Sequence, residues 1–280
     1  MSDDDPSRTP EATDPTNGTD GTVDVTEGVV IIEIGRPARR NAISSDAAQH
    51  LHDAFLAFEA DPDLRVAVLV GGLDDHEAFC AGADLKDLPR LRPSGPLGPT
   101  RLQLSKPVIA AIEGWCVAGG VELAAWCDLR VAGEGARFGC LERRWGVPLM
   151  DGGTYRLPRI VGLGRALDWI LTGREIDAVE AERHGFVNRV VPDGTALAAA
   201  VDLAATIAAY PWTCVVEDRA STYEGLGLGV EEGLANEDRH GVTTLTTAGL
   251  TEGLDRFAAL QRDRAARGER TPRPGTGDKP

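Results

Sequence analysis

One stretch, residues 106–133 (KPVIAAIEGWCVAGGVELAAWCDLRVAG), constrains the possible folds of the chain more than any other. An apolar run typical of a β-strand follows Pro107. At Gly119-Gly120 the chain passes into VELAAW, which is apolar on nearly every face and therefore predicts a buried helix. Glu122 falls in the first turn of that helix, where a carboxylate is costly to bury unless it has a function or a partner. The stretch is therefore a candidate reaction centre.

The composition limits the class of protein. The 280 residues, 42% hydrophobic and 26% charged, suffice for a sizeable core in one large domain or in a domain with an appendage. No apolar run approaches the length that spans a bilayer, and the acidic first 22 residues lack the apolar segment of a signal peptide. The formal charge of −15 at pH 7, without a basic stripe, argues against nucleic acid and membranes as partners.

Two further features concern the cellular environment. The acidity is explained equally well by adaptation to a salt-rich cytoplasm and by codon bias combined with an acidic tail. The five cysteines are odd in number and form no CxxC pair, so we expect reduced thiols in a cytoplasmic protein. They are Cys80, Cys116, Cys127, Cys140 and Cys214.

Four regions are expected along the chain. Residues 1–22, rich in Asp, Thr, Pro and Gly, predict a disordered acidic tail. Residues 23–195 combine strands with short intervening helices, and residues 196–265 are mainly helical. Residues 266–280 are expected to form a loose tail.

Local signals predict individual elements within these regions. The run Ser44-Ser45-Asp46 can cap a helix that runs to about Ala60, and Asp177 with Glu180 forms a capping-box pattern for a shorter helix. The segment 164–172 is expected to be a helix with one apolar face, made of Ala166, Leu167, Ile170 and Leu171. Strands or hairpins are predicted at 23–35, 66–72, 129–132 and 187–191, and helix breaks near 210–211 and 225–229.

Several familiar signatures are missing from the sequence. There is no GxSxG motif, which argues against a Ser-His-Asp hydrolase of the α/β type. The five histidines show no HExxH spacing, so we expect no metal site. The run GLGLG at residue 225 does not form GxGxxG between a strand and a helix, so no nucleotide cofactor is expected.

Two glycine turns and two glutamates remain as candidate functional groups. Gly82-Ala83 forms a tight turn in FCAGADL (79–85), and Gly119-Gly120 begins a helix. Two backbone amides that converge from such turns on one carbonyl oxygen would stabilise the enolate that develops α to a thioester. Glu142 begins another short helical piece in FGCLERRWG. Taken singly, each glycine pair is typical of an ordinary turn, and each glutamate of a solvated carboxylate at a helix start.

In this order, the motifs resemble those of the crotonase superfamily, which contains the enoyl-CoA hydratases and isomerases. The resemblance runs from about Val23 to Pro192, and continues through LTGREIDAVEAERHGFVNRVVP (171–192). It is densest at RPARRNAIS, FCAGADL, residues 106–133, FGCLERRWG and MDGGTYRLPRIVG. It implies an α/β fold in which residues 23–195 form a spiral of ββα repeats, followed by a helical C-terminal trimerisation region.

The resemblance also implies roles for individual residues. The backbone amides of Ala83 and Gly119 correspond to the oxyanion hole of the family. Glu122 corresponds to the base that takes a proton from the attacking water, and Glu142 to the acid that protonates Cα. The acyl-CoA is the substrate and no separate cofactor is implied. The CoA-binding surface corresponds to Arg40, Ala42, Ala81, Asp84 and Leu85.

The reaction within the family depends on both glutamates. Isomerases of this superfamily can work with the second position alone, so a carboxylate at Glu122 favours hydration of the 2,3 double bond of a 2-enoyl-CoA. The alternatives are double-bond isomerisation, another enolate chemistry on an acyl-CoA, and a non-catalytic acyl-CoA-binding protein. A binding role gives no reason to bury two acids.

The sequence departs from the family pattern around the second glutamate. Met150 is expected to narrow the acyl pocket, and Trp145 replaces a smaller apolar residue. Asp151 is either an additional acid/base or a helix cap, and the cap is the favoured interpretation. An ion pair from Arg143 or Arg144 would keep Glu142 ionised. The segment between Leu85 and Lys106 is shorter than usual and proline-rich, which affects the expected chain-length preference.

Assembly into a homotrimer or a dimer of trimers is implied by the resemblance. The segment 249–262 has an apolar face that suits a neighbouring subunit, although burial within the same chain explains the face equally well. Its members are Leu250, Leu254, Phe257, Ala258 and Leu260.

Overall fold

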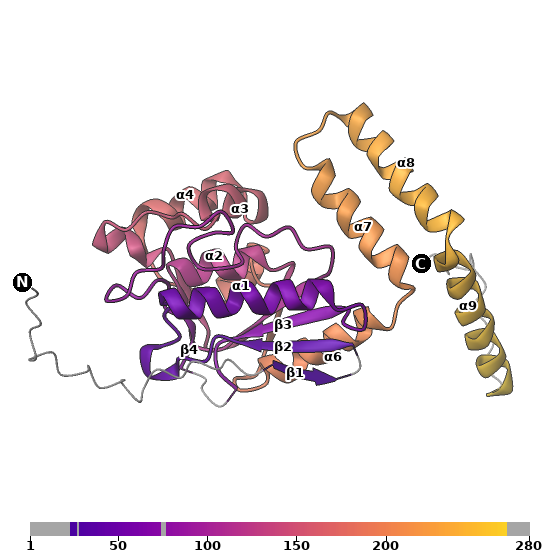
Figure 1. The fold of residues 1–280 in the computed structure, drawn as a ribbon, viewed down its shortest axis with the longest axis horizontal. Helices are drawn as coiled ribbons and strands as arrows, with labels where there is room; N and C mark the ends of the chain where they lie inside the picture. The colour runs from indigo at the N-terminus through magenta and orange to yellow at the C-terminus, as the bar shows by residue number, and fades with distance from the viewer. Residues whose placement is uncertain (1–22, 27, 74–76, 268–280) are drawn as a thin grey trace, which may run out of the picture. The chain divides into compact units, whose positions relative to one another are not determined.

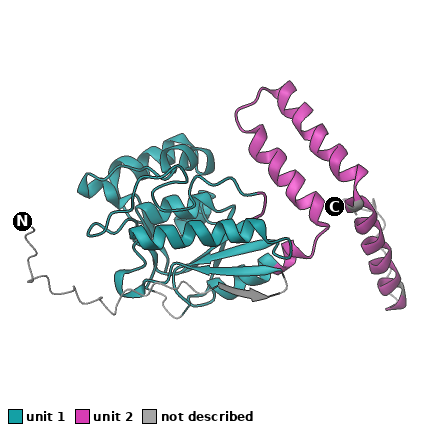
Figure 2. Ribbon diagram, in the orientation of Figure 1, with its two compact units in different colours: residues 1–104, 108–204 teal, residues 105–107, 205–280 magenta. Residues whose placement is uncertain are grey.

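The computed structural model describes residues 23–26, 28–73 and 77–267. The chain divides into two compact units, residues 1–104 with 108–204 and residues 105–107 with 205–280 (Figure 2). The expected tail at 1–22 lies outside the described residues, as does the expected loose end from residue 268 onward.

The first unit contains two sheets, and the chain alternates between them. The six-stranded sheet has the order β1 (Val23–Thr26), β2 (Val29–Glu33), β3 (Val66–Val70), β5 (Val108–Ile112), β7 (Leu129–Gly133), β10 (Arg189–Val191). The four-stranded sheet has the order β4 (Ala78–Cys80), β6 (Trp115–Val117), β8 (Arg137–Gly139), β9 (Ile176–Asp177). The pair β1/β2 is antiparallel and forms the predicted hairpin, whereas β2, β3, β5, β7 and β10 run parallel.

The strands come in successive pairs, one strand for each sheet. β3 and β4, β5 and β6, and β7 and β8 each contribute first to the large sheet and then to the small one. This repetition confirms the predicted spiral of ββα units. All five residues of β3 and of β5 are buried, which accounts for their unbroken apolar sequences.

Short helices separate the strands of the first unit (Figure 1). They are α1 (Ser45–Ala60), α2 (Gly119–Trp126), α3 (Gly153–Ile160), α4 (Leu163–Thr172), α5 (Ala178–Arg183) and the start of α6 (Ala196–Ala208), with 3₁₀ turns at Pro37–Arg39 and Leu141–Trp145. Both helix caps are confirmed, because the Ser44 hydroxyl accepts the Ala47 N–H and the Asp177 carboxylate accepts the Glu180 N–H. The Glu180 carboxylate, which would complete a capping box, accepts from Arg174 instead. Phe55 of α1 packs edge-on against Trp126 of α2, with 4.8 Å between ring centroids.

The predicted inner face of α4 is partly wrong. Ala166 and Ile170 are buried, but Leu167 and Leu171 are 43% and 67% exposed. The helix instead buries Trp169 completely, edge-on against Phe186. Packing the larger indole rotates the helix so that the two leucines face outward.

A buried arginine closes the C-terminal end of α2. The Arg130 guanidinium is 4% exposed and donates to the carbonyls of Ala124 at 3.1 Å and Cys127 at 2.7 Å. It also donates to the carbonyl of Phe186. The last carbonyls of a helix have no internal partner, so Arg130 satisfies them with a permanent positive charge.

The second unit is helical. It contains the end of α6 and then α7 (Trp212–Gly225), α8 (Val230–Thr246) and α9 (Ala248–Ala266), and the helices break at the two predicted places. On α9, Leu250, Leu254, Phe257 and Leu260 are exposed, so packing among the described helices of the second unit does not bury this apolar face. Assembly into trimers stays a prediction.

None of the described helices is by itself long and apolar enough to cross a bilayer, whereas the bent pair α6 and α7 together has the length and composition of a membrane span. Ala196, Ala200 and Ala204 of α6 are fully buried in the protein, as in the core helix of a globular unit.

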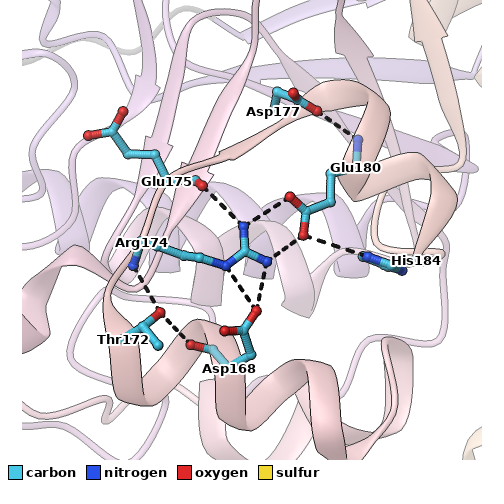
Figure 3. Close-up of polar contacts among 7 residues, drawn as sticks. All are labelled: Asp168, Thr172, Arg174, Glu175, Asp177, Glu180 and His184. Atoms are coloured by element: carbon cyan, nitrogen blue, oxygen red, sulfur yellow. Dashed lines mark hydrogen bonds and ion pairs between the residues drawn. The ribbon is translucent and has the colours of Figure 1, made fainter.

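Arg174 joins three segments of the first unit (Figure 3). Its Nε and Nη2 donate to Asp168 Oδ2 of α4 at 2.9 and 2.7 Å, and its Nη1 donates to Glu180 Oε2 of α5 at 2.9 Å. Hydrogen bonds from this guanidinium hold the pKa of Glu180 below its usual range. The network fastens the 172–175 turn to both helices.

Replacing Arg174 by Gln should therefore lower stability. We expect a loss of about 1–2 kcal/mol, because two charge-assisted pairs are lost from a half-exposed network that solvent partly screens. Urea denaturation followed by circular dichroism measures the change. Arg165→Gln, the same change on an exposed arginine of α4, is the control, and equal stability of the two variants would contradict a structural role for Arg174.

His240 of α8 joins two glutamates of α7. Its Nδ1 lies 2.5 Å from Glu217 Oε2 and its Nε2 lies 3.0 Å from Glu224 Oε2, and Arg239 lies 3.6 Å from the same oxygen of Glu224. Hydrogen bonds to Glu224 and Glu217 raise the pKa of His240. The imidazolium therefore holds α7 and α8 together while it is charged.

The stability that His240 contributes should depend on pH. A raised folded-state pKa means that the contribution is complete below the unfolded value of about 6.5 and is lost as pH rises through the folded value. We expect the difference in Tm between the natural chain and His240→Gln to shrink from pH 6 to pH 9. A difference that stays constant or grows over this range would contradict the ion pairs.

Candidate active site

The turn after β4 and the start of α2 touch each other through glycine. A β-carbon added to Gly82, which has φ +94°, would lie 2.9 Å from the Gly119 nitrogen and 2.9 Å from the Ala118 β-carbon. A β-carbon on Gly119 would lie 3.6 Å from the Ala83 nitrogen. Ala118 itself has φ +53° and ψ −126°, an uncommon conformation that the surroundings must hold in place. A side chain at Gly82 would therefore push the two segments apart.

This contact brings together two backbone amides without protein acceptors. Ala83 pairs with Ile43 in a parallel bridge, in which Ile43 N–H donates to Gly82 and Asp84 N–H donates to Ile43, both at 2.8 Å. The N–H of Ala83 therefore points away from Ile43. Gly119 is the first residue of α2, so its N–H has no partner within the helix. Neither amide donates a hydrogen bond inside the described chain, so both are available to an anionic oxygen.

Glu122, in the first turn of α2 three residues after Gly119, is buried and firmly anchored. It is 3% exposed, and its Oε1 accepts the N–H of Asp151 at 2.9 Å and of Gly153 at 2.8 Å. Burial raises the pKa of Glu122 to about 7; the two amides lower it and the negative charge of Asp151 raises it. A carboxylate with this pKa exchanges a proton readily near neutral pH.

Glu142 is buried but unanchored. It lies in the 3₁₀ turn Leu141–Trp145 at 5% exposure, and neither carboxylate oxygen accepts a hydrogen bond from a described residue. Burial raises the pKa of Glu142. Burial raises the pKa of Cys140 to about 12, and the charges of Glu142 and Glu122 contribute to the increase. Both glutamates are therefore close enough to Cys140 for their charges to act on its thiol.

The arginines after Glu142 do not form the ion pair that the sequence left open. Arg143 Nε donates to the Ile170 carbonyl at 3.3 Å, and Arg144 donates twice to the Gly173 carbonyl, at 3.1 and 2.8 Å. Arg143 lowers the pKa of Glu142 only partly, since burial outweighs its charge. Carbonyls at the end of α4 bind both guanidinium groups and keep them from the Glu142 carboxylate.

The favoured interpretation of Asp151 as a helix cap is wrong. The residue before α3 is Gly152, at φ +100°, and no side chain caps the helix. The Asp151 carboxylate instead accepts the Leu97 N–H at 3.0 Å and the Thr100 hydroxyl. Burial raises the pKa of Asp151, whereas the hydrogen bonds from Thr100 and Leu97 lower it.

A buried ion pair fixes the loop that was expected to bind CoA. Arg36 donates to Asp84 at 3.1 Å and to the Ala42 carbonyl. Burial would raise the pKa of Asp84, but hydrogen bonds from the Lys86 amide and from Arg36 hold it below its usual range. The Asp84 side chain thus holds the loop in place through Arg36, and the Asp84 backbone stays the candidate for a CoA contact.

The other residues expected to bind CoA lie around the same loop. Arg40 is exposed and donates to Glu77 at 2.8 Å, and its carbonyl accepts the Ala81 N–H at 3.0 Å. Leu85 is 60% exposed. The loop brings these residues together with Ala42, and their contact with a ligand stays a prediction.

Other side chains near the site do not carry chemistry of their own. Cys80 is fully buried, and burial raises the pKa of its thiol to about 12, which agrees with its interpretation as a packing residue. Met150 and Trp145 are exposed, at 41% and 74%. No group of three or more His, Cys, Asp or Glu side chains within the described ranges is arranged to hold a metal.

A family model described as enoyl-CoA hydratase/isomerase matches residues 24–263. The chain belongs to this family. It is 40% identical over 205 residues to a Mycobacterium tuberculosis protein named enoyl-CoA hydratase EchA19, a match that covers 69% of this chain and 76% of the relative. It is 35% identical to a Bacillus subtilis protein named putative enoyl-CoA hydratase/isomerase YngF, over 84% of this chain and 94% of the relative.

Solved structures agree with the sequence comparisons. A crystal structure named enoyl-CoA hydratase, from Mycobacterium tuberculosis, superposes with a TM-score of 0.80 at 34% identity and covers 85% of this chain and 95% of its own. The crotonase-like fold is therefore confirmed, and the chain is an enzyme of the hydratase/isomerase family.

Sequence reasoning missed three residues that hold the site in shape. Asn41 is fully buried at φ +54°, accepts the Arg36 N–H at 2.9 Å and donates to the Ala78 carbonyl at 2.7 Å. Leu97 and Thr100, the two partners of Asp151, lie in a loop for which no regular structure was expected. The sequence offered two signals. Asn tolerates positive φ, which concerns Asn41, and residues 95–100 have the turn-forming sequence Gly-Pro-Leu-Gly-Pro-Thr, which contains Leu97 and Thr100.

The raised pKa of Glu122 can be measured without any substrate. We expect its carboxyl ¹³C resonance in glutamate-labelled protein to titrate with a midpoint near 7, because burial disfavours the charged form. The Glu122→Gln variant assigns the resonance by its loss. A midpoint below 5, close to that of a solvated glutamate, would contradict the burial that the structure shows.

Proposed function

We propose that the protein adds water across the 2,3 double bond of a 2-enoyl-CoA thioester. The observation that carries the proposal is the contrast between two buried glutamates, one anchored by two amides and one without a hydrogen-bond partner in the described chain. An anchored carboxylate serves as a positioned base. An unpartnered buried carboxyl is favoured in its protonated form and serves as an acid.

The reaction is written with the thioester carbonyl on the amides of Ala83 and Gly119. Water attacks Cβ while Glu122 accepts one of its protons, and the π electrons move to the carbonyl oxygen. The resulting enolate is stabilised by the two N–H groups, which act as the oxyanion hole. Collapse of the enolate takes a proton from Glu142 to Cα, so water has been added and the two glutamates have exchanged protonation states.

Two alternatives use the same site. An isomerase moves a proton along the acyl chain and needs no attacking water, and an acyl-CoA-binding protein needs neither glutamate. The anchoring of Glu122 supports hydration, since a fixed base beside the oxyanion amides is what a directed water requires. The relatives named enoyl-CoA hydratase support the same choice.

Conversion of either glutamate to glutamine should abolish most of the activity. We expect Glu122→Gln and Glu142→Gln each to lower kcat for crotonyl-CoA hydration by about 10²–10⁴-fold, because each removes a proton-transfer group. Loss of the ultraviolet absorbance of the conjugated thioester follows the reaction, because addition of water removes the 2,3 double bond.

Glu134→Gln, the same change at an exposed glutamate, is the matched control and should retain activity. Binding of butyryl-CoA by calorimetry, retained in all three variants, separates lost chemistry from lost binding. Natural-chain kcat in both glutamine variants would sink the mechanism, and binding without turnover of any enoyl-CoA would favour the acyl-CoA-binding alternative.

A further inference from the structure

Residues 150–153, which lead into α3, supply both amides that anchor Glu122, and we call them the anchoring turn. The N–H groups of Asp151 and Gly153 donate to the same carboxylate oxygen, Oε1, at 2.9 and 2.8 Å. A β-carbon on Gly153 would lie 3.0 Å from that oxygen, so the turn packs directly against the carboxylate. α3, which follows the turn, packs against α2, which carries Glu122 (Figure 1). The position of the carboxylate therefore depends on the direction of two backbone N–H groups.

Three carbonyls of the anchoring turn accept hydrogen bonds of their own. Arg101 Nη2 donates to the Met150 carbonyl at 2.7 Å. Arg156 Nη1 donates to the Asp151 carbonyl at 2.9 Å, and the Arg156 N–H donates to the Gly152 carbonyl at 2.8 Å. Two guanidinium groups from different parts of the chain thus bind the backbone that anchors the carboxylate.

One peptide group joins Arg101 to Glu122. The Met150 carbonyl and the Asp151 N–H belong to the same planar trans peptide, in which the two bonds point in opposite directions. A guanidinium on the carbonyl therefore fixes the plane that aims the N–H at the Glu122 carboxylate. It also polarises the peptide, because hydrogen bonds that follow one another in a chain strengthen each other. Arg101 thus acts on Glu122 although its own side chain is exposed.

Arg156 fixes the next peptide group with both arms of its guanidinium. While Nη1 binds the Asp151 carbonyl, Nη2 donates to the Thr100 carbonyl at 2.6 Å. Gly152 has φ +100°, and a β-carbon there would lie 2.0 Å from Arg156 Nη1, so the guanidinium lies directly against the turn. The Asp151 carboxylate adds a third connection, because its Oδ1 accepts the Leu97 N–H and the Thr100 hydroxyl. The anchoring turn is therefore held from outside by the loop that precedes β5.

We propose that Arg101 and Arg156 are positioning residues of the reaction, which bind the outer carbonyls of the anchoring turn and keep its two N–H groups aimed at Glu122. This role rests on the proposed function, since it takes Glu122 as the base. A base that is displaced by about 1 Å can lose about 10²-fold in rate. Both arginines act through the backbone and not on the substrate, so their loss should lower kcat and leave KM nearly unchanged.

Other ionisable groups near Glu122 set the direction of the expected change. The negative charge of Asp151 raises the pKa of Glu122, whereas the amides of Asp151 and Gly153 lower it. Burial raises the pKa of Cys140 to about 12, so this thiol, on which the charges of Glu122 and Glu142 act, stays neutral in the working range of the enzyme. Release of the two amides should therefore raise the pKa of Glu122 further.

Variants of the two arginines separate positioning from charge. Arg156→Ala removes the guanidinium, whereas Arg156→Lys keeps the charge and loses the two-armed contact. Arg101→Ala removes an exposed side chain. Arg159→Ala, on the same helix as Arg156, is the matched control, because Arg159 donates to a carbonyl of its own helix. We expect kcat for crotonyl-CoA hydration to fall about 10–100-fold in the first three variants, with KM within about threefold, and to stay unchanged in Arg159→Ala.

The carboxyl ¹³C titration of Glu122 reports on the anchor without turnover. We expect its midpoint to rise by about one pH unit in Arg156→Ala, Arg156→Lys and Arg101→Ala, and to stay unchanged in Arg159→Ala. The acid limb of the pH profile of kcat should move by the same amount. Guanidinium ion at about 50 mM should raise kcat of Arg156→Ala at least about fivefold, because it offers the same planar donors to the two carbonyls. A general loss of packing would not respond to this ion.

Two outcomes would overturn the proposal. One is a natural kcat and an unchanged Glu122 midpoint in both Arg156→Ala and Arg101→Ala. The other is full activity in Arg156→Lys with a deficit in Arg156→Ala, which would show that charge alone matters. Circular dichroism checks the fold of each variant, and if Arg156→Ala does not fold, Arg156→Lys and Arg101→Ala decide with the same measurements. If the natural chain hydrates no enoyl-CoA, the titration midpoints still test the arginines, so failure of the proposed function is recognised separately.

Discussion

The direct contact between the Gly82 turn and the first residue of α2 is the constraint on which the rest of the site depends. A β-carbon on Gly82 would lie 2.9 Å from the Gly119 nitrogen, and one on Gly119 would lie 3.3 Å from Gly82 Cα, so the two backbones are in close contact. The spiral supplies the two segments from different repeats, one after β4 and one after β6, and these strands are neighbours in the small sheet. This winding brings the amide of Ala83, in the turn after β4, close to the amide of Gly119, at the start of α2. No separate binding loop is needed.

Three carboxylates share this small region, and their hydrogen bonds distinguish them. Glu122 accepts two backbone amides, Asp151 accepts one amide and one hydroxyl, and Glu142 accepts none within the described chain. Burial is the main cause that raises the pKa of all three, and their hydrogen-bond partners differ. The structure thereby allows one acid to be fixed in place, one to organise a loop and one to stay free for a ligand. The same residue type performs different tasks because the backbone around it differs.

Much of the fold could be predicted from local sequence. The β-branched runs, the caps at Ser44 and Asp177 and the glycine turns depend on neighbours within a few residues, and they were found where the sequence placed them. The partners of Asp151 lie 51 and 54 residues away, and no local pattern announces them. The prediction of the buried face of α4 was wrong for a related reason. The spacing of the leucines does not show that the larger Trp169 is the side chain that is buried. The orientation of the Arg143 and Arg144 side chains likewise depends on carbonyls at the end of α4, about 30 residues later in the chain.

Arg130 gives α2 a property that goes beyond packing. The helix offers its first amide at one end, and at the other end, about 12 Å away for eight residues, its carbonyls are bound by a guanidinium that does not titrate in the accessible pH range. The polarity of the helix is therefore set by the fold and is independent of solvent acidity. Within the candidate site, the groups with shifted pKa values that could make proton transfer depend on pH include the buried carboxyl groups of Glu122 and Glu142, whereas the backbone amides keep the same polarity at every pH.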